Sequence, residues 1–223
     1  MRREEWLELL REATRSLERW EDGWAEWPEL GPDAGAEVAL SELVARLRNN
    51  YPFGHPRYAG QMIKPPHPLA WVAHAVTALV NPNNHALDGG PATAALELEA
   101  VAALAAMVGY PSYPGAHLGH LTASGTIANL EALWVAREVT DGRPIAVSAA
   151  AHYTHARMAQ VLGVEVVPVP ADAAGRLDVD ALAALLARRS IGTVVATLGT
   201  TGLGALDPLD AILTDYRATI ESY

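Results

Sequence analysis

Residues 119–137 read GHLTASGTIANLEALWVAR, and this stretch decides the fold. A turn of small residues, 122–126, runs directly into a helical pattern in which Ile127, Leu130 and Trp134 share one face. Small residues let a ligand approach the backbone, and the first turn of a helix leaves amide N–H groups unpaired. Those donors and the positive end of the helix dipole bind phosphate. The stretch therefore predicts a site for a phosphorylated ligand, although Ser or Thr before a helix is more often only an N-cap.

The composition of the chain limits the classes of function. Half of the 223 residues are hydrophobic, which suffices for the core of one large domain. The sequence has no cysteine, so disulfides and thiolate metal sites are excluded, and no metal is predicted. The net charge of −10 without a run of Lys or Arg argues against nucleic acid or an anionic membrane as a partner. The N-terminus lacks the apolar core of a signal peptide and no apolar run reaches the ~20 residues of a membrane span, so we expect a soluble, cytoplasmic protein.

The N-terminal part of the sequence is predicted to be helical with irregular connections. A heptad-like apolar seam consists of Trp6, Leu10, Ala13, Leu17 and Trp20. Such a seam fits a helix that packs on a partner chain, and equally one that packs on its own domain. Segments rich in Pro, Gly, His and Asn separate the predicted helices. These helices span residues 3–20, 36–48, 69–79 and 93–107.

From residue 119 onward, the pattern changes to alternating helices and strands. Repeated βα units imply a mainly parallel sheet with helices on its faces, and ligands bind such sheets at the C-terminal ends of the strands. Asp207 followed by Pro208 predicts the N-cap and first position of the last helix. The predicted strands span residues 145–148, 165–169 and 193–197, and the preceding helices span residues 127–139, 155–162 and 179–189.

Two loops at the predicted strand ends carry polar side chains. His152 is either a polar loop residue or an imidazole that stacks on a planar cofactor and transfers protons. His155 and Arg157, which follow on the next helix, are expected to face solvent or to pair with carboxylates. Residues 196–204, ATLGTTGLG, form either a tight connection or a ligand-binding edge lined by threonine hydroxyls.

An ordered set of motifs makes the chain resemble the group II pyridoxal-5'-phosphate (PLP)-dependent amino acid decarboxylases. Relatives in that family include glutamate, tyrosine and aromatic amino acid decarboxylases and sphingosine-phosphate lyase. The resemblance extends from about residue 55 to about residue 212, and several matches in one order are far more specific than any single match. The matching segments are HPRYAGQM at 55–62, NPNN at 81–84, LE at 96–97, LTASGTIANL at 121–130, AHYT at 151–154, ATLGTT at 196–201 and GALDP at 204–208.

The resemblance implies an α/β fold, the large domain of a fold type I PLP-dependent enzyme. This domain has a mainly parallel sheet with flanking helices, follows an N-terminal helical segment, and is expected to be incomplete at the C-terminus. Residues 1–90 would form the helical segment and the loops on the substrate side. Residues 91–223 would form the first part of the PLP-binding domain.

The resemblance also implies roles for individual residues. Ser124, Gly125 and Thr126 would bind the PLP phosphate. His152 would stack on the pyridine ring as the catalytic residue and assist proton transfer there, while the cofactor acts as the electron sink. Thr197 would lie near the edge of the ring. The residues expected on the substrate side are Tyr58, Gln61 and Asn83.

Two residues that the family needs have no counterpart in this sequence. An Asp that pairs with the pyridinium nitrogen and a Lys that forms the Schiff base both lie downstream of the GTT motif in the family. Lys64 is the one lysine here, and it is expected to be an exposed loop residue. Asp207 and Asp210 are expected at the start of a helix and do not replace the pyridinium partner. We therefore expect the N-terminal half of such an enzyme, inactive alone: a fragment, a truncated gene product or a subunit of a split enzyme.

Three functions stay open on the sequence. The first is PLP-dependent decarboxylation of an L-amino acid by the complete enzyme. The second keeps the fold and the cofactor but is an aldehyde lyase or an aminotransferase. The third is a non-catalytic remnant or assembly partner. The expected partners are a small-molecule amino acid and either a second copy of the chain in a homodimer or the missing C-terminal half.

Overall fold

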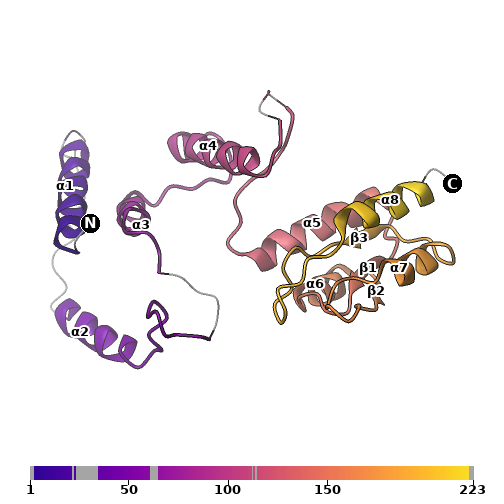
Figure 1. Cartoon of the computed structure of the whole chain (residues 1–223). Coiled ribbons are helices and arrows are strands. Elements are labelled where there is room, and N and C mark those ends of the chain that lie inside the picture. The colour runs from indigo at the N-terminus through magenta and orange to yellow at the C-terminus, as the bar shows by residue number, and fades with distance from the viewer. Residues whose placement is uncertain are drawn as a thin grey trace. The chain divides into compact units, whose positions relative to one another are not determined.

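The computed structural model describes residues 3–21, 23, 35–60, 65–111, 113 and 115–220, and the side chains as far as residue 216. The chain divides into two compact units, Met1–Tyr113 and Pro114–Tyr223 (Figure 1). The predicted domain boundary at residue 90 stays a prediction. No helix in the described part of the chain is both long and apolar enough to cross a membrane.

The described part of the first unit is helical, as its sequence predicts. Its N-terminal helix packs against its third helix. Trp6, Leu10, Ala13 and Leu17 are half-buried as expected of a seam, whereas Trp20 is 49% exposed and does not belong to it. The four helices are α1 (Arg3–Glu21), α2 (Ala36–Leu47), α3 (Pro68–Val80) and α4 (Pro91–Met107).

Local signals set the ends of α3. Pro68 occupies the first helical position, where its missing N–H costs nothing, and His67 Nδ1 accepts a hydrogen bond from the Leu69 amide at 3.3 Å. Asn81 ends the helix in the left-handed conformation, with φ of 47°. Interior packing in this unit is sparse: its buried hydrophobic side chains, among the described residues, are Val72, Ala94 and Ala105.

The second unit is a three-stranded parallel sheet with helices on both faces. The strand order is β2-β1-β3, and Ile145 of the central strand aligns with Val166 and with Thr193. This confirms the predicted α/β class and the parallel sheet. The elements in chain order are α5 (Gly125–Val139), β1 (Ile145–Ser148), α6 (Thr154–Leu162), β2 (Val166–Val169), α7 (Val179–Leu186), β3 (Thr193–Val195) and α8 (Leu209–Ile220).

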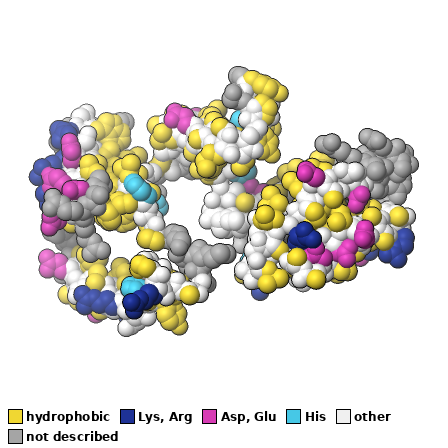
Figure 2. Space-filling view, in the orientation of Figure 1, with side chains coloured by type: hydrophobic (Ala, Val, Ile, Leu, Met, Phe, Trp, Pro, Cys, Tyr) yellow, Lys and Arg dark blue, Asp and Glu magenta, His cyan; other side chains and the backbone are white. Residues whose placement is uncertain are grey.

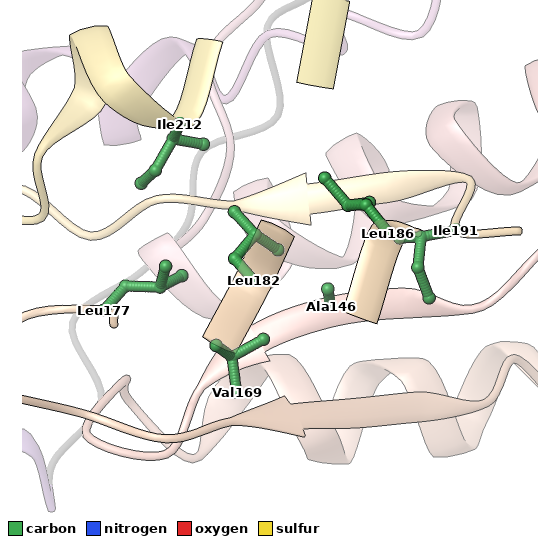
Figure 3. Packing of buried hydrophobic residues seen from close by; sticks show 7 residues of the cluster. All are labelled: Ala146, Val169, Leu177, Leu182, Leu186, Ile191 and Ile212. Atoms are coloured by element: carbon green, nitrogen blue, oxygen red, sulfur yellow. The ribbon is translucent and has the colours of Figure 1, made fainter. Parts of the chain in front are cut away.

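The core of the second unit lies on both faces of β1, whose four residues are all buried. Successive strand residues point to opposite faces, so Ile145 and Ala146 contact different layers. Ile145 packs with Leu133, Ala159 and Val164 from the α5 and α6 side. Ala146 belongs to the larger cluster shown in Figure 3, which consists of Ala146, Val169, Leu177, Leu182, Leu186, Ile191 and Ile212. Continuous apolar strands of this kind are typical of a parallel sheet covered on both sides.

Candidate cofactor site

Three segments of the second unit meet the same edge of its sheet. The segments that follow β1 and β3 leave the carboxyl ends of neighbouring parallel strands. Helix α5 leads through a short turn into β1, so its N-terminus lies at the edge where β1 ends. Figure 1 shows the start of α5 and the loop between β3 and α8 at the same end of this unit.

Ser124 caps helix α5. Its backbone is extended and its Oγ accepts a hydrogen bond from the Ile127 amide at 3.3 Å. Thr122 Oγ1 donates to the Ser124 carbonyl at 2.9 Å, and Asn129 Nδ2 donates to the Gly125 carbonyl at 2.8 Å. The capping role of Ser124 that the sequence left open is therefore present. These bonds fix the turn from which the helix starts.

Gly125 and Thr126 present free amide groups in the first turn of α5. Among the described residues, no acceptor takes the amide hydrogen of either residue. A Cβ built on Gly125 would meet no atom of the described chain within 4 Å, and Thr126 is exposed. Unpaired donors at an open, positively polarised helix end fit a phosphate group. The residues present here thus fit the phosphate of PLP.

His152 lies in the turn that follows β1. Ser148 starts this turn, because its Oγ accepts from the Ala150 amide at 3.2 Å and its carbonyl accepts from the Ala151 amide at 3.0 Å. His152 Nδ1 in turn accepts from the Thr154 amide at 3.2 Å. A ring nitrogen that accepts carries no proton, so a neutral His152 carries its proton on Nε2.

The aromatic side chain beside His152 orders the loop further. The His152 and Tyr153 ring centroids are 4.1 Å apart with an angle of 32° between the ring planes. The Arg157 guanidinium carbon lies 4.3 Å from the centroid of the Tyr153 ring, a cation–π contact. Arg157 is exposed, which agrees with the expectation that it faces solvent. The half-buried imidazole of His152 is thus held in a stacked group rather than left free.

The expectation that His155 faces solvent or pairs with a carboxylate is wrong, because the residue is buried. It is 8% exposed, and its Nδ1 is buried without a hydrogen-bond partner in the described chain. The residue lies one turn before Ala159 on the face of α6 that packs on α5, which explains its burial. Burial first, and then the nearby His152, lower the pKa of His155 from its usual value.

The segment between β3 and α8, residues 196–208, is a tight hairpin that we call the β3–α8 loop. Thr200 organises it: its amide donates to the Ala205 carbonyl at 2.9 Å, and its Oγ1 accepts from the Ala205 amide at 3.0 Å. Gly199 and Gly204 have φ of 115° and 64°, conformations that favour glycine. Thr197 Oγ1 is buried and, among the described residues, has no partner, so it fits a ligand that accepts or donates a hydrogen bond.

Asp207 is not the N-cap that its position before Pro208 predicts. Helix α8 begins at Leu209, and Asp207 is 3% exposed. Its Oδ1 accepts from the Leu177 amide at 2.7 Å and its Oδ2 from the Thr197 amide at 2.6 Å. The side chain thus bonds two backbone amides outside α8 instead of an amide of the first turn of that helix. The local Asp-Pro signal is therefore overridden by partners that lie far back in the sequence.

The residues predicted on the substrate side belong to the first unit. The Tyr58 ring packs edge-on against Phe53, with centroids 5.3 Å apart, and lies 6.4 Å from the Tyr51 ring. Asn83 is exposed, and its Oδ1 accepts from the His85 amide at 3.0 Å. Gln61, like Lys64, lies outside the described residues. The described part of the chain contains no group of three or more acidic and histidine side chains arranged to hold a metal ion.

Comparison with protein families and relatives gives one consistent result. The model of the pyridoxal-dependent decarboxylase conserved domain matches residues 53–216. A probable L-aspartate decarboxylase of Halobacterium salinarum is 37% identical over 168 residues, which are 74% of this chain and 45% of that protein. The L-2,4-diaminobutyrate decarboxylase of Rhizobium meliloti is 35% identical over 196 residues, 82% of this chain and 39% of that protein. The chain thus spans less than half the length of these relatives.

Solved structures share the fold. Mouse CSAD superposes with a TM-score of 0.73 and 26% identity over 92% of this chain and 46% of its own. The structure of Oryza sativa TDC with PLP and tryptamine has a TM-score of 0.74 at 16% identity, covering 98% of this chain and 56% of its own. At that identity the second likeness shows the fold alone.

Proposed function

The chain belongs to the pyridoxal-dependent decarboxylase family, and from this premise we propose that it supplies the cofactor-binding part of an enzyme that decarboxylates an L-amino acid. The observation that carries the proposal is the open first turn of α5 beside two polar strand-end loops. One edge of the sheet carries amides and a buried threonine hydroxyl that have no partner among the described residues, together with a histidine whose ring lies against that of Tyr153.

The amides of Gly125 and Thr126, with the Thr126 hydroxyl, would hold the phosphate of PLP. Ser124 would contribute by fixing the helix start, because its hydroxyl already caps α5. Thr197 Oγ1 would hydrogen-bond at the edge of the ring. When bound, PLP supplies the electron sink for breaking a bond at the amino acid α-carbon. The protein binds and orients the reactants at this edge of the sheet.

His152 is the proposed catalytic residue of this chain. Its ring would stack on the cofactor ring, and its Nε2 would be the nitrogen that exchanges a proton, because the Thr154 amide occupies Nδ1. Tyr58, Gln61 and Asn83 are proposed to lie toward the substrate. The Tyr51, Phe53 and Tyr58 rings support one another, which would keep the Tyr58 ring in a fixed orientation.

The remaining groups of the reaction are proposed to come from other chain segments, either in a homodimer or in a chain that carries the rest of the domain. The exposed apolar side chains of the first unit support an assembled state, since such surfaces are stable when covered. The cytoplasm is the proposed compartment, where proteins without disulfides are usual.

The proposed reaction is tested in a complete enzyme that carries residues 1–223. Incubation with individual L-amino acids should release CO₂ and the corresponding amine in equal amounts. Formation of a 2-oxo acid or of an aldehyde without the amine would assign another reaction. The matched control is the same enzyme with His152→Ala, which should retain PLP while losing most of the turnover.

A further inference from the structure

We propose that Asp207 is a positioning residue of the cofactor site, which sets the place of Thr197 by tying the β3–α8 loop to the turn after β2. This inference rests on the proposed function. The turn consists of residues 171–177, and we call it the β2–α7 turn. Asp207 itself would not touch the cofactor, because it is 3% exposed and both of its carboxylate oxygens face backbone amides.

Asp207 holds the backbone of Thr197 at both of its polar groups. Its carboxylate accepts the Thr197 amide hydrogen at 2.6 Å, and its own amide donates to the Thr197 carbonyl at 3.0 Å. The Thr197 side chain contributes nothing to this arrangement, since its hydroxyl has no partner in the described chain. The location of the hydroxyl is therefore set by the backbone, and the backbone is set by Asp207.

The second carboxylate oxygen of Asp207 reaches a rigid support. It accepts from the amide of Leu177, which is 1% exposed and belongs to the main core cluster. The β2–α7 turn is closed by a bridge between Ala171 and Leu177, and Asp172 Oδ1 accepts from the amides of Ala174 and Arg176, both at 2.9 Å. The β3–α8 loop is thus fastened to a turn that is itself well determined.

A close contact joins the same two segments independently of Asp207. Gly175 has φ of 76°, and a Cβ at this position would come within 2.5 Å of Leu203 Cδ1. The backbone of the β2–α7 turn therefore approaches the tip of the β3–α8 loop closely. Leu203 is 73% exposed, so its contact with the turn is a surface contact that a substitution removes without opening the core.

The chemistry of the contact requires a carboxylate. Both partners of the side chain are N–H donors, and both need an acceptor. An asparagine has one carbonyl oxygen, so its NH₂ group would face one of the two amides. Among the described residues no Lys, Arg or His forms an ion pair with Asp207, and its side chain accepts from the two amides. Asp207→Asn is therefore a substitution of equal size that should release one of the two segments.

The experiment uses the full chain with Asp207→Asn and, as a matched control, Asp178→Asn. Asp178 also accepts from a backbone amide, that of Ala181 at 3.0 Å, but this bond caps α7 and does not involve the β3–α8 loop. Amide hydrogen exchange is measured first, without any ligand. Asp207→Asn should speed exchange in residues 196–206, whereas Asp178→Asn should speed exchange in α7 only. Unchanged exchange of Thr197 in Asp207→Asn would overturn the proposal.

Binding of pyridoxine 5'-phosphate, measured by calorimetry, tests whether Asp207 acts through Thr197. This ligand has the ring and the phosphate of PLP but no aldehyde, so it forms no Schiff base with Lys64. Thr197→Val and Asp207→Asn should each weaken binding by roughly tenfold, the effect of about one hydrogen bond. The double variant should be no weaker than the single ones, because both changes remove the same contact. Additive losses, or a loss in Asp178→Asn equal to that in Asp207→Asn, would contradict the positioning role.

The measurements also distinguish a wrong phosphate site from a wrong role of Asp207. If the unaltered chain binds pyridoxine 5'-phosphate no better than pyridoxine, the phosphate site of the proposed function is wrong, and the exchange data alone decide whether Asp207 holds the loop. If Asp207→Asn does not fold, Asp207→Glu replaces it, because the longer side chain keeps both acceptor oxygens but displaces them by one methylene group from the Leu177 and Thr197 amides. That variant should speed exchange in the β3–α8 loop and weaken binding by about twofold, with exchange in α7 unchanged. No change in either measurement would overturn the proposal.

Discussion

The two units of the chain differ in how many hydrophobic side chains they bury. The second unit contains twelve of the fifteen buried hydrophobic residues in the described chain, and the first unit contains three. The strand-end loops of the second unit are therefore held by a core, by the buried Asp207 and by a tight hairpin. The proposed phosphate site lies within the second unit, which has a core of its own, whereas the described part of the first unit buries little apolar surface.

Helix α2 of the first unit has no buried side on which to pack. None of its residues is buried. A helix of 12 residues is marginally stable without packing of its apolar face, so α2 depends on a covering surface. Figure 2 likewise shows hydrophobic side chains on the visible faces of α3 and α4. The exposed apolar residues of α2 are Val38, Leu40, Leu43, Val44 and Leu47.

The largest expected effect is on the free energy of unfolding, and it should differ between a core residue of the second unit and an exposed residue of the first. Leu182 is fully buried in α7, so Leu182→Ala should lower the free energy of unfolding by about 2–5 kcal/mol. Leu43 is 52% exposed in α2 of the single chain, so without a covering partner Leu43→Ala should change it by less than about 0.5 kcal/mol. Urea denaturation of the full chain measures both values. Equal effects of the two variants would show that α2 is packed as firmly as the sheet.

The next effect concerns the chemistry of the second unit. In a complete enzyme carrying residues 1–223, His152→Ala should reduce turnover by on the order of 10²-fold or more, because it removes proton transfer and orientation. PLP affinity should fall by only about 0.5–1.5 kcal/mol, the contribution of a stacked ring.

The control for His152→Ala must be an exposed residue. His155 is unsuitable because it is buried, so Gln160→Ala on the exposed face of α6 is the matched substitution. Steady-state kinetics and PLP titration of both variants provide the measurement. A larger loss of affinity than of turnover in His152→Ala would assign the residue to binding alone.

Substitutions in the first turn of α5 test the phosphate end. Thr126→Ala should weaken binding of pyridoxine 5'-phosphate by about 1.5–3 kcal/mol, the range for a hydrogen bond to a charged group. Gly125→Val should weaken it further, because a branched side chain would fill the open space in front of the amides. Unphosphorylated pyridoxine should bind the unaltered chain, Thr126→Ala and Gly125→Val alike. Unchanged affinity for the phosphate ester in both variants would move the phosphate site elsewhere.

The smallest effect is a pH dependence that belongs to the second unit. The pKa of His155 is lowered by burial in the folded chain, while the unfolded chain binds the proton at an ordinary value of about 6.5. Below that value the unfolded state binds more protons, so the free energy of unfolding should fall with falling pH, by at most about 1.4 kcal/mol per pH unit for one group.

His155→Gln removes this contribution and should flatten the slope of stability against pH between about pH 5 and 7. His74→Gln, on an exposed position of α3, is the control and should keep the slope of the unaltered chain. Urea midpoints at several pH values provide the comparison. A slope in His155→Gln equal to that of the control would show that His155 is readily protonated in the folded state.

Much of the fold could be predicted from local patterns. The strand Ile145–Ser148 has the predicted bounds, and the helices agree within a few residues at each end. Caps account for several of these boundaries: Asp178 accepts from the Ala181 amide as its sequence position predicts, and Gly163 ends α6 with φ of 67°. The family resemblance, carried by ordered motifs, is confirmed by the family model over residues 53–216.

The wrong expectations about Asp207 and His155 have different physical causes. Asp207 bonds amides 30 and 10 residues earlier, and no local rule finds them. The polarity of His155 predicts exposure, whereas its spacing to Ala159 and Leu162 places it on the buried face of α6. That periodicity was a signal that could have identified its burial. The roles of the residues in the site stay predictions.

The central claim is that the second unit presents a preformed phosphate site at the start of α5. The most direct test is nuclear magnetic resonance of the full chain titrated with pyridoxine 5'-phosphate and, in parallel, with pyridoxine. We expect the phosphate ester to shift the amide signals of Gly125 and Thr126 most strongly and pyridoxine to leave them in place. Equal shifts with both ligands, or no shift of these two amides with the phosphate ester, would contradict the central claim.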